Sequence, residues 1–110
     1  MSVNGIWKIE MLTTYDWEPR ATAFLRDGSY WGGGAQHYAV GNYTVDGTKF
    51  LADILIVTHG KPRALFGKQV DRYDISVEAE KSDDGFTGVG KDKDGNHVIQ
   101  YRITKLADLP

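Results

Sequence analysis

The chain has 110 residues, of which 41% are hydrophobic and 12% aromatic, so it suits a single globular domain over residues 1–110 and is too apolar to be disordered. Its formal net charge is -2, without the basic excess that phosphate contacts need, so we expect no direct binding to nucleic acid. Cysteine is absent, which excludes disulfide bonds and thiolate metal sites.

Apolar and polar residues alternate with a period of two along most of the chain, which predicts β-strands. No apolar pattern keeps helical spacing for three turns, so little or no helix is expected. Segments 13–19 and 59–71 interrupt the alternation and are expected to be loops. The strand over 48–58 is so apolar that burial on both faces is expected in its middle. In chain order the expected strands span 6–11, 21–26, 29–31, 37–46, 48–58, 72–81, 86–91 and 97–105.

Glycine-containing pairs between these segments indicate hairpin turns. Asp27-Gly28 and Asp46-Gly47 are pairs that tolerate the positive φ angles of tight hairpins. About eight hairpin-connected strands predict an all-β, antiparallel up-and-down barrel. Closure is favoured because an open sheet leaves two unpaired edges. Glycines at 32–34, 41, 88 and 90 are expected to allow the bends that closure needs.

No catalytic or metal-binding constellation is visible. His37, His59 and His97 lie on separate segments without the spacing of a metal site, and no serine has the context of a nucleophile. The glycines at 32–34 lack the lysine and helix of a phosphate loop. We therefore expect no enzyme activity, no catalytic residue, no metal and no cofactor.

Aromatic residues in the predicted strands are candidates for the barrel interior. Tyrosine and tryptophan combine a large apolar body with a polar atom, which suits a wall that binds a small apolar ligand. The alternative is that these side chains simply fill the core. The candidate residues are Trp7, Trp31, Tyr38, Tyr43, Tyr73 and Tyr101.

The loop over 59–71 is a candidate for contact with a partner. Lys61 and Arg63 precede Leu65 and Phe66, so apolar residues lie among basic ones. Long loops in compact domains are often functional, and exposed apolar residues ringed by charge are typical of interfaces. The alternative is a lid whose Leu65 and Phe66 close one end of the barrel.

The sequence resembles the GrlR-like family of negative regulators of type III secretion over nearly its whole length. The resemblance rests on Asn4-Gly5-Ile6-Trp7, Arg26-Asp27-Gly28-Ser29, Tyr30-Trp31-Gly32-Gly33-Gly34, Tyr38 and Gly41-Asn42-Tyr43. It implies a lipocalin-like, or calycin, barrel of eight strands that forms a homodimer. It also implies binding to a transcription activator rather than to DNA, and a hydrophobic cavity able to hold a lipid-like ligand.

One turn departs from the family pattern. The enteric repressor contacts its activator through a run of acidic residues after the fourth strand, whereas residues 45–49 here contain only Asp46 as an acid. Asp46 is therefore the one partner-contact candidate that the resemblance adds. The expected function is non-enzymatic regulation by protein–protein contact; the alternative is a lipocalin-like barrel for a small apolar ligand.

The expected location is the cytoplasm. Residues 1–5 lack the basic and apolar regions of a signal peptide. No apolar run approaches the roughly 20 residues of a membrane helix, so no membrane association is expected.

Overall fold

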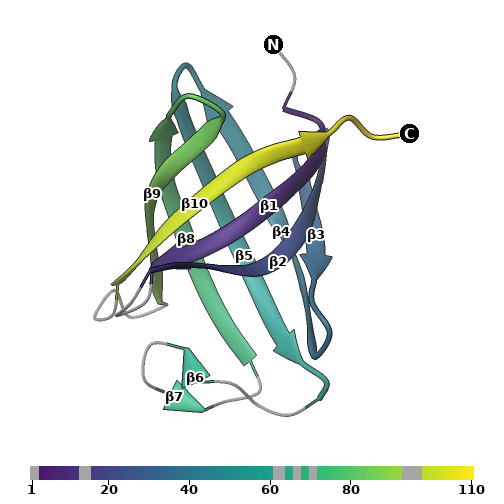
Figure 1. Ribbon diagram of the computed structural model, residues 1–110, viewed down its shortest axis with the longest axis vertical. Coiled ribbons are helices and arrows are strands. Elements are labelled where there is room, and N and C mark those ends of the chain that lie inside the picture. The colour runs from purple at the N-terminus through teal and green to yellow at the C-terminus, as the bar shows by residue number, and fades with distance from the viewer. Residues whose placement is uncertain (1–2, 13–15, 61–63, 66–67, 70–71, 93–97) are drawn as a thin grey trace.

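The computed structural model describes residues 3–12, 16–60, 64–65, 68–69, 72–92 and 98–110. Within these ranges every regular element is a strand (Figure 1). The strands are β1 (Gly5–Leu12), β2 (Trp17–Arg26), β3 (Ser29–Gly33), β4 (His37–Asp46), β5 (Lys49–Thr58), β6 (Ala64–Leu65), β7 (Lys68–Gln69), β8 (Arg72–Lys81), β9 (Gly85–Asp92) and β10 (Val98–Ala107).

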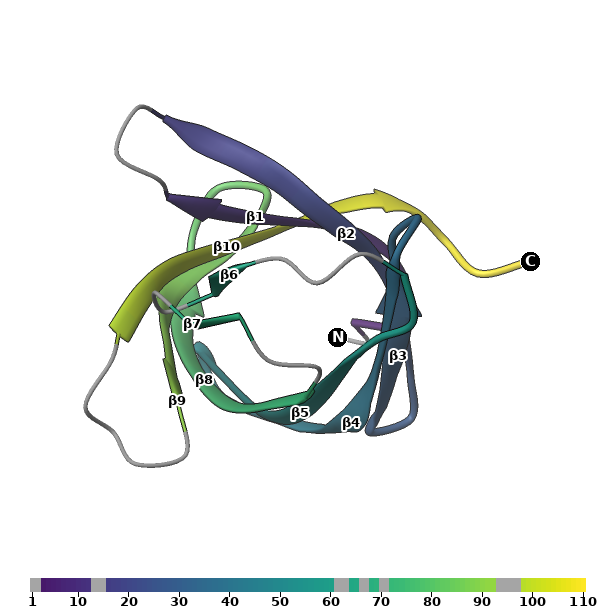
Figure 2. The same ribbon diagram turned by 90° about the horizontal axis from the view of Figure 1, so that it is seen from below.

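Eight of these strands close into a barrel in the order β1-β10-β9-β8-β5-β4-β3-β2. All pairs are antiparallel, and β1 closes the ring because it pairs with both β2 and β10. The predicted all-β, eight-stranded antiparallel barrel is confirmed. The short strands β6 and β7 form a separate two-stranded sheet. They lie beyond the end of the barrel where β5 ends and β8 begins, and Figure 2 shows them across the opening.

Two tight hairpins set the register of the first half of the barrel. Asp27 and Gly28 both have positive φ, 49° and 90°, as a type I′ turn requires. The next hairpin has Gly47 and Thr48 as its two loop residues, because β4 ends at Asp46 and β5 begins at Lys49. A φ of 62° at Gly47 fits a turn with glycine in the first central position. Both predicted hairpins are confirmed, the second with its loop one residue later.

Strand β2 begins earlier than the sequence predicted. Trp17 already pairs with Leu12, so the expectation of a loop over 13–19 is wrong for its last residues. The register shifts between the pairs Ile9 with Ala21 and Glu10 with Pro19, which leaves Arg20 as the extra residue of a β-bulge. The extra residue of a bulge exchanges the inward-facing and outward-facing positions that follow it. The alternation in the sequence is therefore interrupted although the strand continues.

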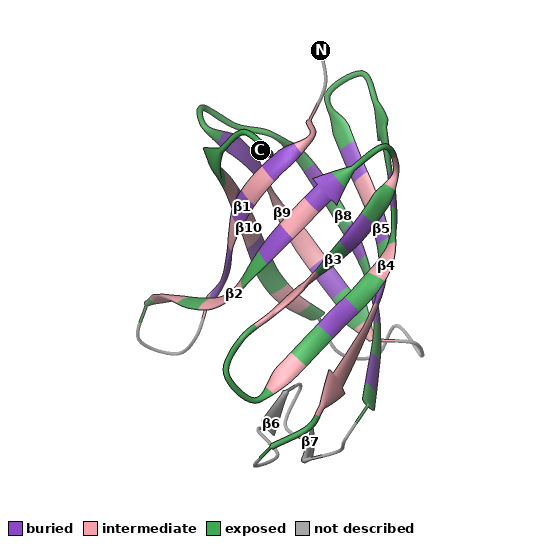
Figure 3. Cartoon of the chain, turned by 90° about the vertical axis from the view of Figure 1, so that its right-hand side faces the viewer, coloured by how far each residue is buried: buried purple, intermediate pink, exposed green. Residues whose placement is uncertain are grey.

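Alternate residues of each barrel strand build the core, as the banded colouring in Figure 3 shows. Strand β8 is the clearest case, because Tyr73, Ile75 and the next two odd-numbered residues are buried while their even-numbered neighbours are exposed. Strand β5 follows the same rule: Asp53 is exposed in its middle. The expectation that this strand is buried on both faces is therefore wrong.

Gly41 and Gly88 are among the glycines at which neighbouring strands approach too closely for a side chain. A Cβ atom added to Gly41 would overlap the carbonyl oxygen of Asp53, and one added to Gly88 would overlap that of Glu78. Such approaches accompany strong bending of a sheet. Gly90 differs, because a Cβ there would meet only side-chain atoms at ordinary contact distances, the nearest being Ile99 Cγ2 at 3.5 Å.

Candidate functional site

The structure divides the six aromatic candidates between the two faces of the barrel wall. Trp7, Tyr43, Tyr73 and Tyr101 are buried in the core. Trp31 and Tyr38 are 40% and 45% exposed. The prediction that Trp31 and Tyr38 line the interior is therefore wrong.

Strand parity explains this correction. Trp31 follows the buried Tyr30, and Tyr38 precedes the buried Ala39, so both must point outward. The prediction weighed residue type and did not weigh these neighbours. Tyr30 is buried although it was not among the six candidates, and its alternation with Trp31 is the signal that identifies it. Phe50 and Phe86 are two further buried aromatic residues outside that set.

Four aromatic rings pack in a continuous series inside the barrel. Trp7 lies 6.1 Å from Phe86 between ring centroids, Phe86 lies 5.3 Å from Phe50, and Phe50 lies 5.5 Å from Tyr43. The indole N–H of Trp7 donates to the carbonyl oxygen of Val3 at 2.9 Å, so its polar atom is satisfied. These contacts favour a core-filling role for Trp7 and Tyr43.

Two tyrosine hydroxyls form a hydrogen-bonded polar pair within this apolar interior. Tyr30 Oη and Tyr101 Oη lie 3.0 Å apart and are buried. Burial raises the pKa of Tyr30 to about 12 and raises the pKa of Tyr101 well above its ordinary value, so both are neutral near neutral pH. One hydroxyl donates to the other, and in the described part of the chain the second O–H has no protein acceptor.

An apolar row crosses the outer face of the wall. In register, Ile6 of β1 lies beside Phe24, Phe24 beside Trp31, Trp31 beside Val40, and Val40 beside Leu55. We call these five residues the outer row. Val40 is 44% exposed, and the Phe24 and Trp31 rings stack with centroids 6.2 Å apart. Five strands thus contribute one apolar side chain each to a continuous band facing solvent.

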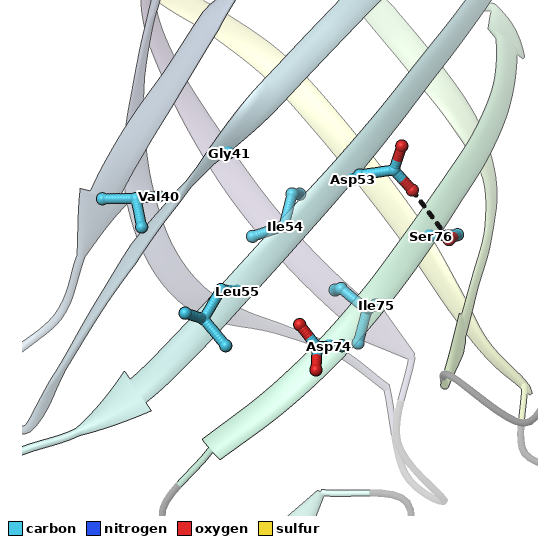
Figure 4. A pocket seen from close by; sticks show the side chains of 8 residues that line it. All are labelled: Val40, Gly41, Asp53, Ile54, Leu55, Asp74, Ile75 and Ser76. Atoms are coloured by element: carbon cyan, nitrogen blue, oxygen red, sulfur yellow. Dashed lines mark hydrogen bonds between the residues drawn. The ribbon is translucent and has the colours of Figure 1, made fainter.

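The outer row ends in a hollow flanked by carboxylates. Val40 and Leu55 line this hollow of about 280 Å³ together with Asp53, Asp74 and Ser76 (Figure 4). Leu55 pairs with Asp74 across β5 and β8. Ser76 Oγ donates to Asp53 Oδ1 at 2.9 Å. We call this place the acidic hollow.

A second polar cluster lies on the outer wall across β1 and β10. Arg102 Nε donates to Glu10 Oε1 at 3.1 Å, and Lys8 Nζ lies 3.6 Å from the same oxygen. The Arg102 guanidinium lies 4.3 Å from the centroid of the Trp17 ring. Glu10 is buried although it faces outward, and its hydrogen bond to Arg102 lowers its pKa despite burial. The sequence prediction missed this cluster because it placed Trp17 in a loop.

Among the predicted partner-contact residues, the structure describes the side chain of Asp46 alone. Asp46 is exposed at the end of β4, opposite Lys49. Lys61, Arg63 and Phe66 lie outside the described residues, as does the side chain of Leu65.

The described residues contain no group of three or more histidine, aspartate or glutamate side chains that could hold a metal ion. Nor do they contain a helix long and apolar enough to cross a membrane. Fold and surface together define a small antiparallel β-barrel with an exposed apolar row on its wall. No known family model matches the chain, and no curated protein matches it.

Proposed function

We propose that this chain is a non-enzymatic regulatory protein that acts by protein–protein contact through the outer wall of its barrel. The observation that carries the proposal is the outer row, in which Trp31 and Val40 remain exposed although Phe24 and Leu55 lie beside them in register. Contiguous exposed apolar side chains rimmed by polar ones are typical of interaction sites. Tryptophan is also enriched among the residues that dominate binding energy at interfaces.

The GrlR-like resemblance supports the regulatory part of this proposal. It adds a transcription activator as the partner, negative regulation of type III secretion as the process, a homodimer as the assembly and the cytoplasm as the location. Exposed Asp46 stays a candidate contact for the activator. Native mass spectrometry tests the assembly: we expect the mass of two chains, and a monomer at tens of micromolar protein would contradict it.

Two matched substitutions test whether the outer row is the contact surface. Val40→Glu places a charge in the outer row, and Val98→Glu places the same charge on β10, at a valine that is 55% exposed. Immobilised wild-type protein and the Val98→Glu variant should retain the same partner from a lysate of the organism of origin. Val40→Glu should lose it, because a buried unpaired charge opposes binding. Equal retention by all three proteins would contradict the proposal.

The Tyr30–Tyr101 pair favours a second candidate function, a barrel for a small apolar ligand. Its spare O–H is a donor inside an apolar interior, where it would suit the carbonyl or carboxyl oxygen of an amphiphile. Titration with a long-chain fatty acid, followed by tryptophan fluorescence, tests this candidate. Saturable binding that Tyr30→Phe/Tyr101→Phe weakens would support it, and an unchanged spectrum would contradict it.

A further inference from the structure

The acidic hollow holds two carboxylates without a cationic partner among the described residues, whereas several carboxylates elsewhere on the barrel have one. Glu10 has Arg102, Glu80 has Lys49 at 4.0 Å, and Asp108 has Lys105 at 2.7 Å. For Asp53 and Asp74, by contrast, no ion pair is found with any described residue. Both are exposed.

These two carboxylates adjoin the apolar end of the outer row. Asp74 lies beside Leu55 in register, and Asp53 lies two residues before Leu55 on the same face of β5. Val40, on the neighbouring strand, lines the same hollow. The lining of the hollow therefore combines apolar side chains on β4 and β5 with negative charge on β5 and β8.

This combination restricts the chemistry of an occupant. A neutral apolar partner that covered Val40 and Leu55 would also remove water from the neighbouring carboxylates, and burying unpaired charge is strongly unfavourable. A second copy centred on the same hollow would bring four carboxylates together. A segment with apolar side chains and a lysine or arginine at one end satisfies both parts of the surface.

The dimensions fit a short helix. From Phe24 to Leu55 the outer row crosses three inter-strand steps of about 4.8 Å, or about 14 Å. A helix rises about 1.5 Å per residue, so about ten residues span that distance. Amphipathic helices that lie in apolar grooves present their contacts at positions i, i+3, i+4 and i+7.

We infer that the outer row and the acidic hollow together bind an amphipathic segment of another protein, whose apolar stripe ends in a lysine or arginine. This inference rests on the proposed function and specifies its partner. The apolar stripe covers Trp31, Val40 and Leu55, and the cation lies between Asp53 and Asp74.

A synthetic helical peptide with a leucine stripe and two arginines at one end is the probe. A second peptide has glutamates in place of the arginines and is otherwise identical. Calorimetry should detect binding of the arginine peptide alone, with amide NMR shifts concentrated on β3, β4, β5 and β8. Failure of the wild-type protein to bind the arginine peptide would overturn the inference.

Charge variants then locate the cation. Asp53→Asn/Asp74→Asn should weaken binding of the arginine peptide about tenfold, since each pair with a cation contributes about 1 kcal/mol or less at an exposed site. Asp83→Asn/Asp84→Asn changes the net charge equally, on the exposed turn between β8 and β9, and should leave affinity unchanged. Equal losses in both variants would show unspecific attraction and overturn the inference.

Two further outcomes separate this inference from the proposed function. In the first, Val40→Glu no longer retains the lysate partner, while Asp53→Asn/Asp74→Asn retains it with unchanged affinity. That result would support the outer row as the contact surface and overturn the inference that the partner carries a cation. If the wild-type protein is a dimer that Val40→Glu splits, and no peptide binds, the outer row belongs to a second copy. Circular dichroism and thermal melts of each variant confirm that the barrel still folds.

Discussion

Tyr30 and Trp31 are consecutive residues of β3 that serve opposite faces of the barrel wall. The Tyr30 hydroxyl lies 3.0 Å from that of Tyr101 in the core, while the Trp31 ring stacks on Phe24 outside. The same strand therefore supplies a polar point to the interior and an aromatic group to the proposed contact surface.

Removing one hydroxyl of the buried pair should cost more stability than removing both. Tyr101→Phe leaves the Tyr30 hydroxyl buried without a partner, which should lower the free energy of unfolding by about 1–3 kcal/mol. Tyr30→Phe/Tyr101→Phe removes both polar groups and should be closer to wild type than the sum of the single variants. Urea unfolding of the wild type, Tyr30→Phe, Tyr101→Phe and the double variant measures these free energies. A loss in the double variant equal to the sum of the two single losses would contradict the prediction.

The same pair predicts a loss of stability at alkaline pH. The pKa of Tyr30 is raised from 10.0 to about 12 in the folded chain, so folding favours the neutral form. Its contribution is fully present below pH 10 and is lost as pH rises from about 10 to 12. Unfolding midpoints measured between pH 8 and 12 should fall over this window, and less steeply in Tyr30→Phe/Tyr101→Phe. Identical slopes in the two proteins would contradict the assignment.

Arg102 should protect the barrel against acid. Its hydrogen bond holds the pKa of Glu10 below 4.5, so the pair stabilises the fold above that pH and loses its effect as pH falls below it. Arg102→Met should lower the free energy of unfolding at pH 7 by about 2 kcal/mol, because a buried carboxylate loses its main donor. It should also flatten the dependence of stability on pH between 5 and 3. If the free energy of unfolding of this variant fell between pH 5 and 3 as steeply as that of the wild type, the prediction would be wrong.

Two glycines on one strand should respond differently to a methyl group. Gly88→Ala forces a Cβ onto the carbonyl oxygen of Glu78, so we expect a loss of about 3 kcal/mol or more, or failure to fold. Gly90→Ala meets only side chains at ordinary distances and should change stability by about 1 kcal/mol or less. Thermal melts of the two variants compare them directly; similar losses would show that close strand approach at Gly88 is not the cause.

Strand alternation predicted much of this fold because its signal is local. The strands 37–46 and 72–81 were predicted with the bounds that the structure shows, and the tight turns followed from their glycines. The start of β2 was missed because the bulge at Arg20 changes the parity on which the pattern depends.

The proposed contact surface was not predictable in the same way. Phe24, Trp31, Val40 and Leu55 are each an ordinary outward residue of one strand. They form a row only because of the register of four strands. That register depends on several turns together, so no single sequence motif indicates it. The pairing of Asp74 with Leu55 is likewise a consequence of the register between β5 and β8. The segment between them was predicted to be a loop, whereas it contains the short strands β6 and β7.

A comparison of strains tests the central claim that this chain regulates through its outer wall. Transcript levels are measured in the organism of origin with the gene intact, deleted, or carrying Val40→Glu, Val98→Glu or Tyr101→Phe at matched protein abundance. Val40→Glu should reproduce the transcript changes of the deletion, while the variants on β10 and in the interior should match wild type. A Val40→Glu strain with the wild-type transcript pattern, or a deletion that changes no transcript, would contradict the account.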